Sequence, residues 1–71
     1  MSVFRYYIST NPSEPAPHVS RLAEVIAENK EAAVERITEN CRTLIDWPVV
    51  WVHLLVWSEG EQHGFESMRI R

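Results

Sequence analysis

The chain has 71 residues, which suits a single domain near the lower size limit for independent folding, and 45% of them are apolar, which argues against disorder. Its formal net charge of −3 disfavours functions that need a broad basic patch for nucleic acid. A single cysteine, Cys41, excludes an intrachain disulfide and a thiolate zinc site, so a reducing, cytoplasmic setting is expected.

The first expected element is a strand over residues 3–9, where aromatic and β-branched residues gather. Closely spaced prolines follow, and because proline removes backbone donors and disfavours helix, residues 11–17 are expected to form a loop. A second strand is expected over about residues 20–28. The alternation that predicts it places Ala23, Val25 and Ala27 on one face of the strand and Leu22 and Ile26 on the other.

Asn29 is expected to end this strand and to begin a helix over residues 30–44. Asparagine is unfavourable inside a helix but favourable as an N-cap, where its side chain accepts a hydrogen bond from a backbone N–H. Apolar residues then recur at helical spacing, namely Ala33, Val34, Ile37, Cys41 and Leu44. One long helix over residues 19–45 is the alternative, since neither glycine nor proline interrupts it; the strand followed by a helix is preferred.

This junction resembles one found in many small α+β proteins, among them some phage-encoded anti-CRISPR inhibitors. The shared pattern is V-x-A-x-[S/N]-x-x-x-A, and here it consists of Val25, Ala27, Asn29 and Ala33. The resemblance covers residues 25–33 and implies a strand, a cap and a helix in that order. It carries no catalytic or ligand-binding residue.

The second half of the chain predicts two further strands. Pro48 prevents the helix from continuing, and residues 49–57 have the strongest strand pattern in the chain. Residues 58–64 are polar with two glycines, which is typical of a hairpin loop, and residues 65–71 form the last expected strand. The longest apolar run is too short to span a membrane, and the N-terminus lacks the apolar core of a signal peptide.

The resulting fold class is α+β, with the order β-β-α-β-β in a single domain over residues 1–71. We expect a four-stranded, largely antiparallel sheet with one helix packed on one face. The strand order cannot be read from the sequence. The residues expected to face the helix are Phe4, Tyr6, Ile8, Ala23, Val25, Ala27, Val50, Val52, Leu54 and Val56.

One helix covers only one face of a sheet, so the other face is expected to be an exposed apolar surface. Such a patch on a small protein usually marks an interface, with aromatic residues as anchors. The candidate interface residues on this face are Trp51, Trp57, His53, Leu22, Ile26 and Tyr7, with Leu55 beside them. The alternative is that the proline loop or the chain ends cover this face.

The helix also carries an acidic stripe opposite its apolar residues. Glu31, Glu35 and Glu39 follow each other at a spacing of four residues. A solvated helix surface is the simpler interpretation. The alternative is a docking strip for a basic partner, such as the nucleic-acid channel of another protein, in which carboxylates replace phosphates.

The residue types that carry chemistry are sparse and scattered. His18, His53 and His63 show no metal-ligand spacing, and Gly60 and Gly64 do not form a phosphate-binding loop. The carboxylates form no recognisable acid and base pair. We therefore expect no cofactor, no metal and no enzymatic activity.

The function expected from the sequence is a non-catalytic interaction protein that binds a protein partner or a second copy of itself. The aromatic sheet face, the acidic helix or both would provide the surface, and a phage-type inhibitor of a nucleic-acid-binding complex is one specific form. The alternative is a domain that binds single-stranded nucleic acid by stacking bases on exposed sheet aromatics. The arginines available to meet phosphates are Arg5, Arg21, Arg69 and Arg71, while Glu24 and Glu28 oppose such binding.

Overall fold

The computed structural model describes residues 1–58 and 61–71, and the side chains of residues 19, 56–58 and 61–63 lie outside that description. The predicted α+β class and the β-β-α-β-β order are confirmed. The elements are β1 (Ser2–Ser9), a short 3-10 helix η1 (Val19–Arg21), β2 (Ala23–Ala27), α1 (Lys30–Leu44), β3 (Trp51–Ser58) and β4 (Glu61–Arg69).

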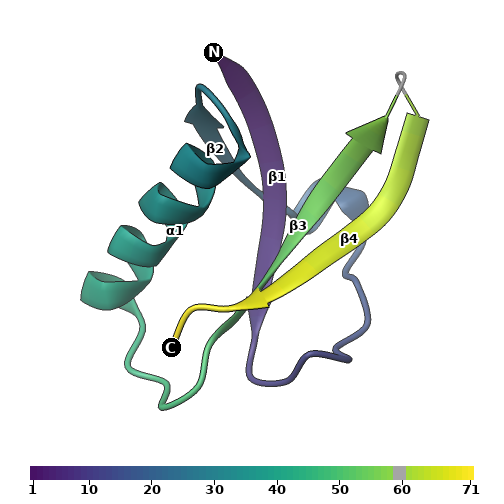
Figure 1. The fold of residues 1–71 in the computed structure, drawn as a ribbon. Coiled ribbons are helices and arrows are strands. Elements are labelled where there is room, and N and C mark those ends of the chain that lie inside the picture. Colours follow the sequence, from purple (N-terminus) through teal and green to yellow (C-terminus); the bar gives the residue numbers. More distant parts are fainter. Residues whose placement is uncertain (59–60) are drawn as a thin grey trace.

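The four strands form one antiparallel sheet in the order β2-β1-β3-β4 (Figure 1). Because β2 and β3 each run antiparallel to β1, which lies between them, they are parallel to each other. Parallel strands need a crossover connection, and α1 provides it. The helix therefore lies on one face of the sheet, in front of β2 in the view of Figure 1.

The junction around Asn29 forms as expected. The Asn29 side chain accepts a hydrogen bond from the backbone N–H of Ala32 at 2.8 Å, and α1 begins at the next residue. The alternative of one long helix is wrong, because residues 23–27 pair with β1 in an antiparallel ladder. The second strand is shorter than predicted, since η1 occupies residues 19–21.

The connection between the last two strands differs from the prediction. β3 extends to Ser58 and β4 begins at Glu61, so most of the predicted loop over residues 58–64 belongs to strands, and residues 59–60 lie outside the described residues. Val56 pairs with Gly64 whereas Trp57 pairs with Gln62, so β4 contains one extra residue, a β-bulge. Gly64 has a φ of 111°, which glycine adopts without a steric penalty. This bulge explains why a strand carries the glycine expected of a loop.

The hydrophobic core lies between α1 and the sheet face that it covers. Ile37 and Cys41 of α1 pack against Val52 and Leu54 of β3 and against Val50, which directly precedes β3. The partly buried residues around them include Phe4, Tyr6, Ile8, Val25 and Met68. The predicted inward face is thus confirmed for β1, β3 and Val25, and the side chain of Val56 lies outside the described residues.

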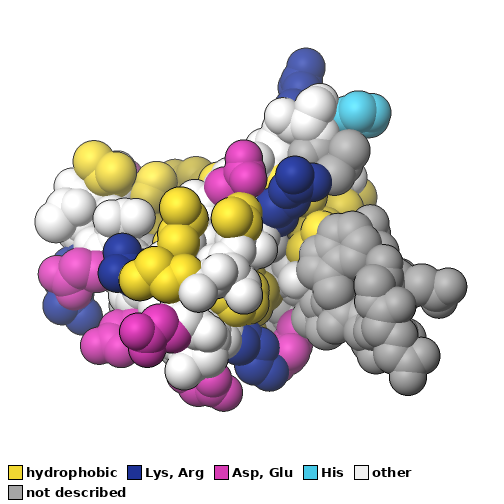
Figure 2. Space-filling model, turned by 90° about the horizontal axis from the view of Figure 1, so that it is seen from above, with side chains coloured by type: hydrophobic (Ala, Val, Ile, Leu, Met, Phe, Trp, Pro, Cys, Tyr) yellow, Lys and Arg dark blue, Asp and Glu magenta, His cyan; other side chains and the backbone are white. Residues whose placement is uncertain are grey.

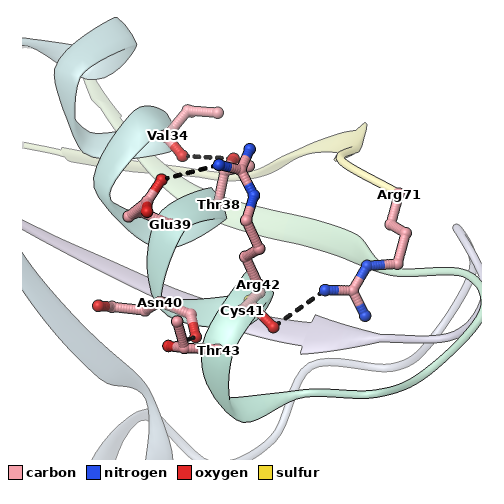
Figure 3. A network of polar contacts seen from close by, with 8 residues as sticks. All are labelled: Val34, Thr38, Glu39, Asn40, Cys41, Arg42, Thr43 and Arg71. Carbon is pink, nitrogen blue, oxygen red and sulfur yellow. Dashed lines mark hydrogen bonds and ion pairs between the residues drawn. The ribbon is translucent and has the colours of Figure 1, made fainter.

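Arg71 stabilises the C-terminal end of α1 (Figure 3). Its guanidinium donates hydrogen bonds to the carbonyl oxygens of Ile45 at 2.7 Å, Trp47 at 2.9 Å and Cys41 at 3.0 Å. The last carbonyls of a helix lack partners within the helix, and a cation at this end also interacts favourably with the helix dipole. Arg71 is therefore not available to meet phosphates on the outer sheet face, because β4 ends at Arg69 and the side chain turns to the helix.

Replacing Arg71 with alanine is expected to lower the free energy of unfolding by about 1–3 kcal/mol, since these carbonyls lose charged donors. Urea denaturation followed by circular dichroism measures the change. Arg42→Ala is the matched control, because Arg42 forms an exposed pair with Glu39 at 3.2 Å within the helix. Such pairs contribute about 0.3–0.5 kcal/mol. Equal losses in the two variants would contradict the proposed role of Arg71.

Candidate interaction surface

The outer face of the sheet, which lies opposite α1, contains a packed aromatic cluster. Tyr7 and His53 are register partners on β1 and β3, and their rings stack with centroids 4.3 Å apart and an interplanar angle of 14°. Phe65 of β4 meets the Tyr7 ring edge to face at 4.9 Å and 81°. These rings therefore bury much of their surface against one another.

His53 occupies the centre of a chain of hydrogen bonds. Ser9 Oγ donates to the carbonyl oxygen of Asn11 at 2.7 Å and lies 2.6 Å from His53 Nε2. Because the single hydroxyl proton of Ser9 goes to Asn11, Nε2 must be the donor in the second contact. The other ring nitrogen, Nδ1, then accepts from Ser67 Oγ at 2.7 Å. The network thus fixes one neutral tautomer of His53.

The environment of His53 favours the neutral form. The side chain is 1% exposed, and burial lowers the pKa of His53 below its ordinary value of 6.5, against the opposing effects of the Asn11 backbone and the Glu14 carboxylate. Ser9 donates its proton away from the imidazole, so the pair lacks the geometry of a nucleophile activated by a base. The cluster is suited to holding the outer face together.

The segment after β1 covers part of this face. Figure 1 shows residues 10–22 passing behind the sheet, on the side opposite α1. Tyr7 Oη donates to the Glu14 carbonyl at 2.8 Å, which ties this segment to β1. The expectation that Leu55 is exposed is wrong, because it is 2% exposed, and His53, named as a candidate interface residue, is 1% exposed. Alternation along a strand predicts the face of a residue but not whether another segment covers it.

The remaining predicted interface residues differ in exposure. Ile26 is 55% exposed, whereas Tyr7, Leu22 and Trp51 are half-buried. Leu22 precedes β2 instead of belonging to it. The side chain of Trp57 lies outside the described residues, so its predicted role stays a prediction.

One end of the outer face remains uncovered, and we call it the β1–β2 patch. It consists of Met1, Val3 and Ile26, which are 84%, 54% and 55% exposed. Val3 and Ile26 are cross-strand partners, so their side chains lie next to each other. Figure 2 looks down on the end of the molecule where Figure 1 places the N-terminus, and hydrophobic side chains lie there beside acidic ones.

The acidic residues of α1 are exposed, as expected from their position on the helix. Glu31, Glu35 and Glu39 all point away from the core, and Glu39 pairs with Arg42. In Figure 2 acidic side chains gather on the side of the molecule where Figure 1 places α1. Four residues of one helix flank, Ala32, Glu35, Arg36 and Glu39, line a hollow in the surface.

A second cavity, of about 140 Å³, lies between β1 and the last turns of α1. Its lining is mostly apolar and consists of Tyr6, Ile8, Asn40, Cys41, Leu44 and Ile45. Burial raises the pKa of the Cys41 thiol, with Arg71 opposing the shift, so the reactive thiolate is disfavoured at neutral pH.

The geometry of the outer face disfavours single-stranded nucleic acid as a ligand. Base stacking needs an open ring face, but His53 covers one face of Tyr7. Of the arginines expected here, Arg5 lies 3.9 Å from the Glu24 carboxylate and Arg71 binds the helix end. Few cations are therefore placed to meet phosphates.

The structure also shows what sequence reasoning missed. Ser9, Ser67 and Phe65 surround His53 and Tyr7, although they are far apart along the chain. Ser67 is the register partner of His53, so knowledge of the strand order would have identified it. The sequence left open which face Phe65 and Ser67 take, and strand order was the signal that it lacked.

Among residues 1–58 and 61–71, no three His, Cys, Asp or Glu side chains lie close enough together to hold a metal ion. No helix within the described part of the chain is long and apolar enough to cross a membrane. Comparison of the chain with protein family models, curated proteins and solved structures gave no match. Function is therefore inferred from the surface geometry alone.

Proposed function

We propose that this protein is a non-catalytic interaction domain that binds a protein partner through the β1–β2 patch. The observation that supports this most directly is the exposure of Met1, Val3 and Ile26 in a domain whose other outer-face apolar residues are at least half-buried where their side chains are described. Adjacent apolar side chains left in water are typical of surfaces that bind another protein. The patch replaces the wider aromatic face expected from the sequence.

Charge on α1, on the other face of the sheet from the patch, favours a basic partner. The carboxylates of Glu31 and Glu35 are exposed on α1, and no ion pair to either is found within the described residues. Complementary charge speeds association and selects partners. An inhibitor that places carboxylates where another protein binds phosphates is one specific form of this function.

The interaction function is tested by affinity capture from the native host with three versions of the chain. Val3→Glu places a charge in the patch, and we expect the captured partner to bind at least tenfold more weakly, because an apolar contact of about 1.5–3 kcal/mol is lost. Leu44→Glu is the matched control, since Leu44 is 79% exposed but lies on α1, outside the patch. Unchanged capture by Val3→Glu would refute the proposed surface.

A further inference from the structure

We infer that residues 10–18, which we call the strap, open away from the outer sheet face when His53 takes up a proton. This pH-dependent movement does not depend on the proposed partner or on the β1–β2 patch. The strap follows β1 and passes behind the sheet in Figure 1, on the side opposite α1. Opening exposes the centre of the outer face, where His53 and Leu55 are 1% and 2% exposed.

The backbone of the strap contributes little to holding it in place. Pro12, Pro15 and Pro17 have no N–H to donate. Within the part of the chain that the structure describes, no backbone-to-backbone hydrogen bond joins residues 10–17 to a strand. All of these residues are exposed except Pro17, which is half-buried. A segment with so few buried contacts can open at a small cost while the rest of the domain stays folded.

Side chains of β1 anchor the strap instead. Tyr7 Oη donates to the Glu14 carbonyl at 2.8 Å, and Ser9 Oγ donates to the Asn11 carbonyl at 2.7 Å. Within the strap, Asn11 Nδ2 donates to the Glu14 carboxylate at 2.9 Å, so the two anchored residues are joined. Both anchoring side chains also contact His53, because Tyr7 stacks on its ring and Ser9 Oγ lies 2.6 Å from Nε2. The strap and the imidazole are therefore linked through the same two side chains.

The closed strap favours the neutral imidazole of His53. Nδ1 accepts a hydrogen bond from Ser67 Oγ at 2.7 Å, and a protonated ring has no acceptor nitrogen, so this bond cannot persist. The buried ring would also carry a charge without its hydration shell. When the strap opens, water reaches His53 and its pKa returns toward the ordinary 6.5. Because the open form binds the proton more tightly, acidification favours opening.

The charged groups around His53 do not reverse this effect. Burial lowers the pKa of His53 more than the strap raises it through a backbone hydrogen bond and the Glu14 carboxylate. Arg5 of β1 and Arg69 of β4 are cations on the same face, and both disfavour a further positive charge there. His18, the other imidazole of the strap, is exposed, so its protonation costs no comparable burial. The carboxylates of α1 lie on the other side of the sheet.

The inference is tested by NMR of the purified protein, from about pH 8 down to the pH at which α1 unfolds. The ring shifts of His53 follow its protonation, and the nuclear Overhauser contact between the Tyr7 ring and Glu14 follows the position of the strap. We expect this contact to be lost as His53 titrates, while the methyl shifts of Ile37 in the core stay native. The strap then opens before the domain unfolds.

Two variants should move the opening in opposite directions. Tyr7→Phe keeps the stack but removes the anchor to Glu14, so the open form should gain about two- to tenfold in population and His53 should take up its proton at a higher pH. Glu14→Gln keeps the anchoring carbonyl but removes the carboxylate that favours the proton, so His53 should titrate at a lower pH. Tyr6→Phe is the matched control: it makes the same change on the inner face, next to the core, and should leave the titration of His53 unchanged.

Three results would overturn the inference. The first is a contact between Tyr7 and Glu14 that persists while His53 is protonated. The second is protonation of His53 only when α1 unfolds, which would leave no separate movement of the strap. The third is equal titration of His53 in Tyr7→Phe and Tyr6→Phe, which would show that the anchor does not hold the strap closed.

Discussion

Ile37→Ala is expected to leave most of the protein unfolded without denaturant. Ile37 is fully buried at the centre of the core, between α1 and β3. Truncating such a side chain removes apolar burial and leaves a cavity, at a cost of about 2–5 kcal/mol. A domain of this size has a total free energy of unfolding of roughly 3–5 kcal/mol, so the substitution removes most of that stability.

Urea denaturation followed by circular dichroism measures this effect. Leu44→Ala is the matched control, because Leu44 lies on the same helix but is 79% exposed. Leucine and alanine have similar helix propensities, so its expected effect is below about 0.5 kcal/mol. Similar urea midpoints for Ile37→Ala and Leu44→Ala would contradict the placement of Ile37 at the centre of the core.

The protein is also expected to lose stability as the pH falls below 6.5. Burial lowers the pKa of His53 in the folded state from the ordinary 6.5, whereas the unfolded chain keeps the ordinary value. Between the two values the unfolded chain binds the proton and the folded chain does not, so acidification favours unfolding. This stability is fully present above pH 6.5 and is lost as the pH falls through the lowered pKa. Protonation would also place a charge inside the cluster that ties Ser9 to Asn11.

The variant His53→Phe separates the effect of protonating His53 from the effect of its ring packing on Tyr7. Phenylalanine can keep the stack on Tyr7, but the hydrogen bonds to Ser9 and Ser67 are lost, at an expected cost of about 1–3 kcal/mol near pH 8. The decline in unfolding free energy just below pH 6.5 should become shallower in this variant. His18→Phe is the control, because it makes the same substitution at an exposed position outside the cluster. An unaltered slope in His53→Phe would show that another group is responsible.

Local interactions explain why parts of the fold were predictable. The Asn29 cap and the apolar spacing after it involve residues within a few turns of each other, and they set both ends of α1. Alternation along β1 and β3 likewise predicted which side chains enter the core, because neighbouring residues of a strand point to opposite faces. The prediction of the last strand was less accurate, since polar residues and Gly64 are typical of a loop and also fit a bulge.

The amino-acid sequence by itself determined the helix, the order of the elements and the inward face of the sheet, because each depends on residues close together in the chain. Only the tertiary structure decided the state of the outer face. The segment after β1 crosses it, His53 joins Ser9 to Ser67 across three strands, and Arg71 turns away to the end of α1. These contacts join residues far apart in sequence, so they require the strand order β2-β1-β3-β4, which no local pattern specifies.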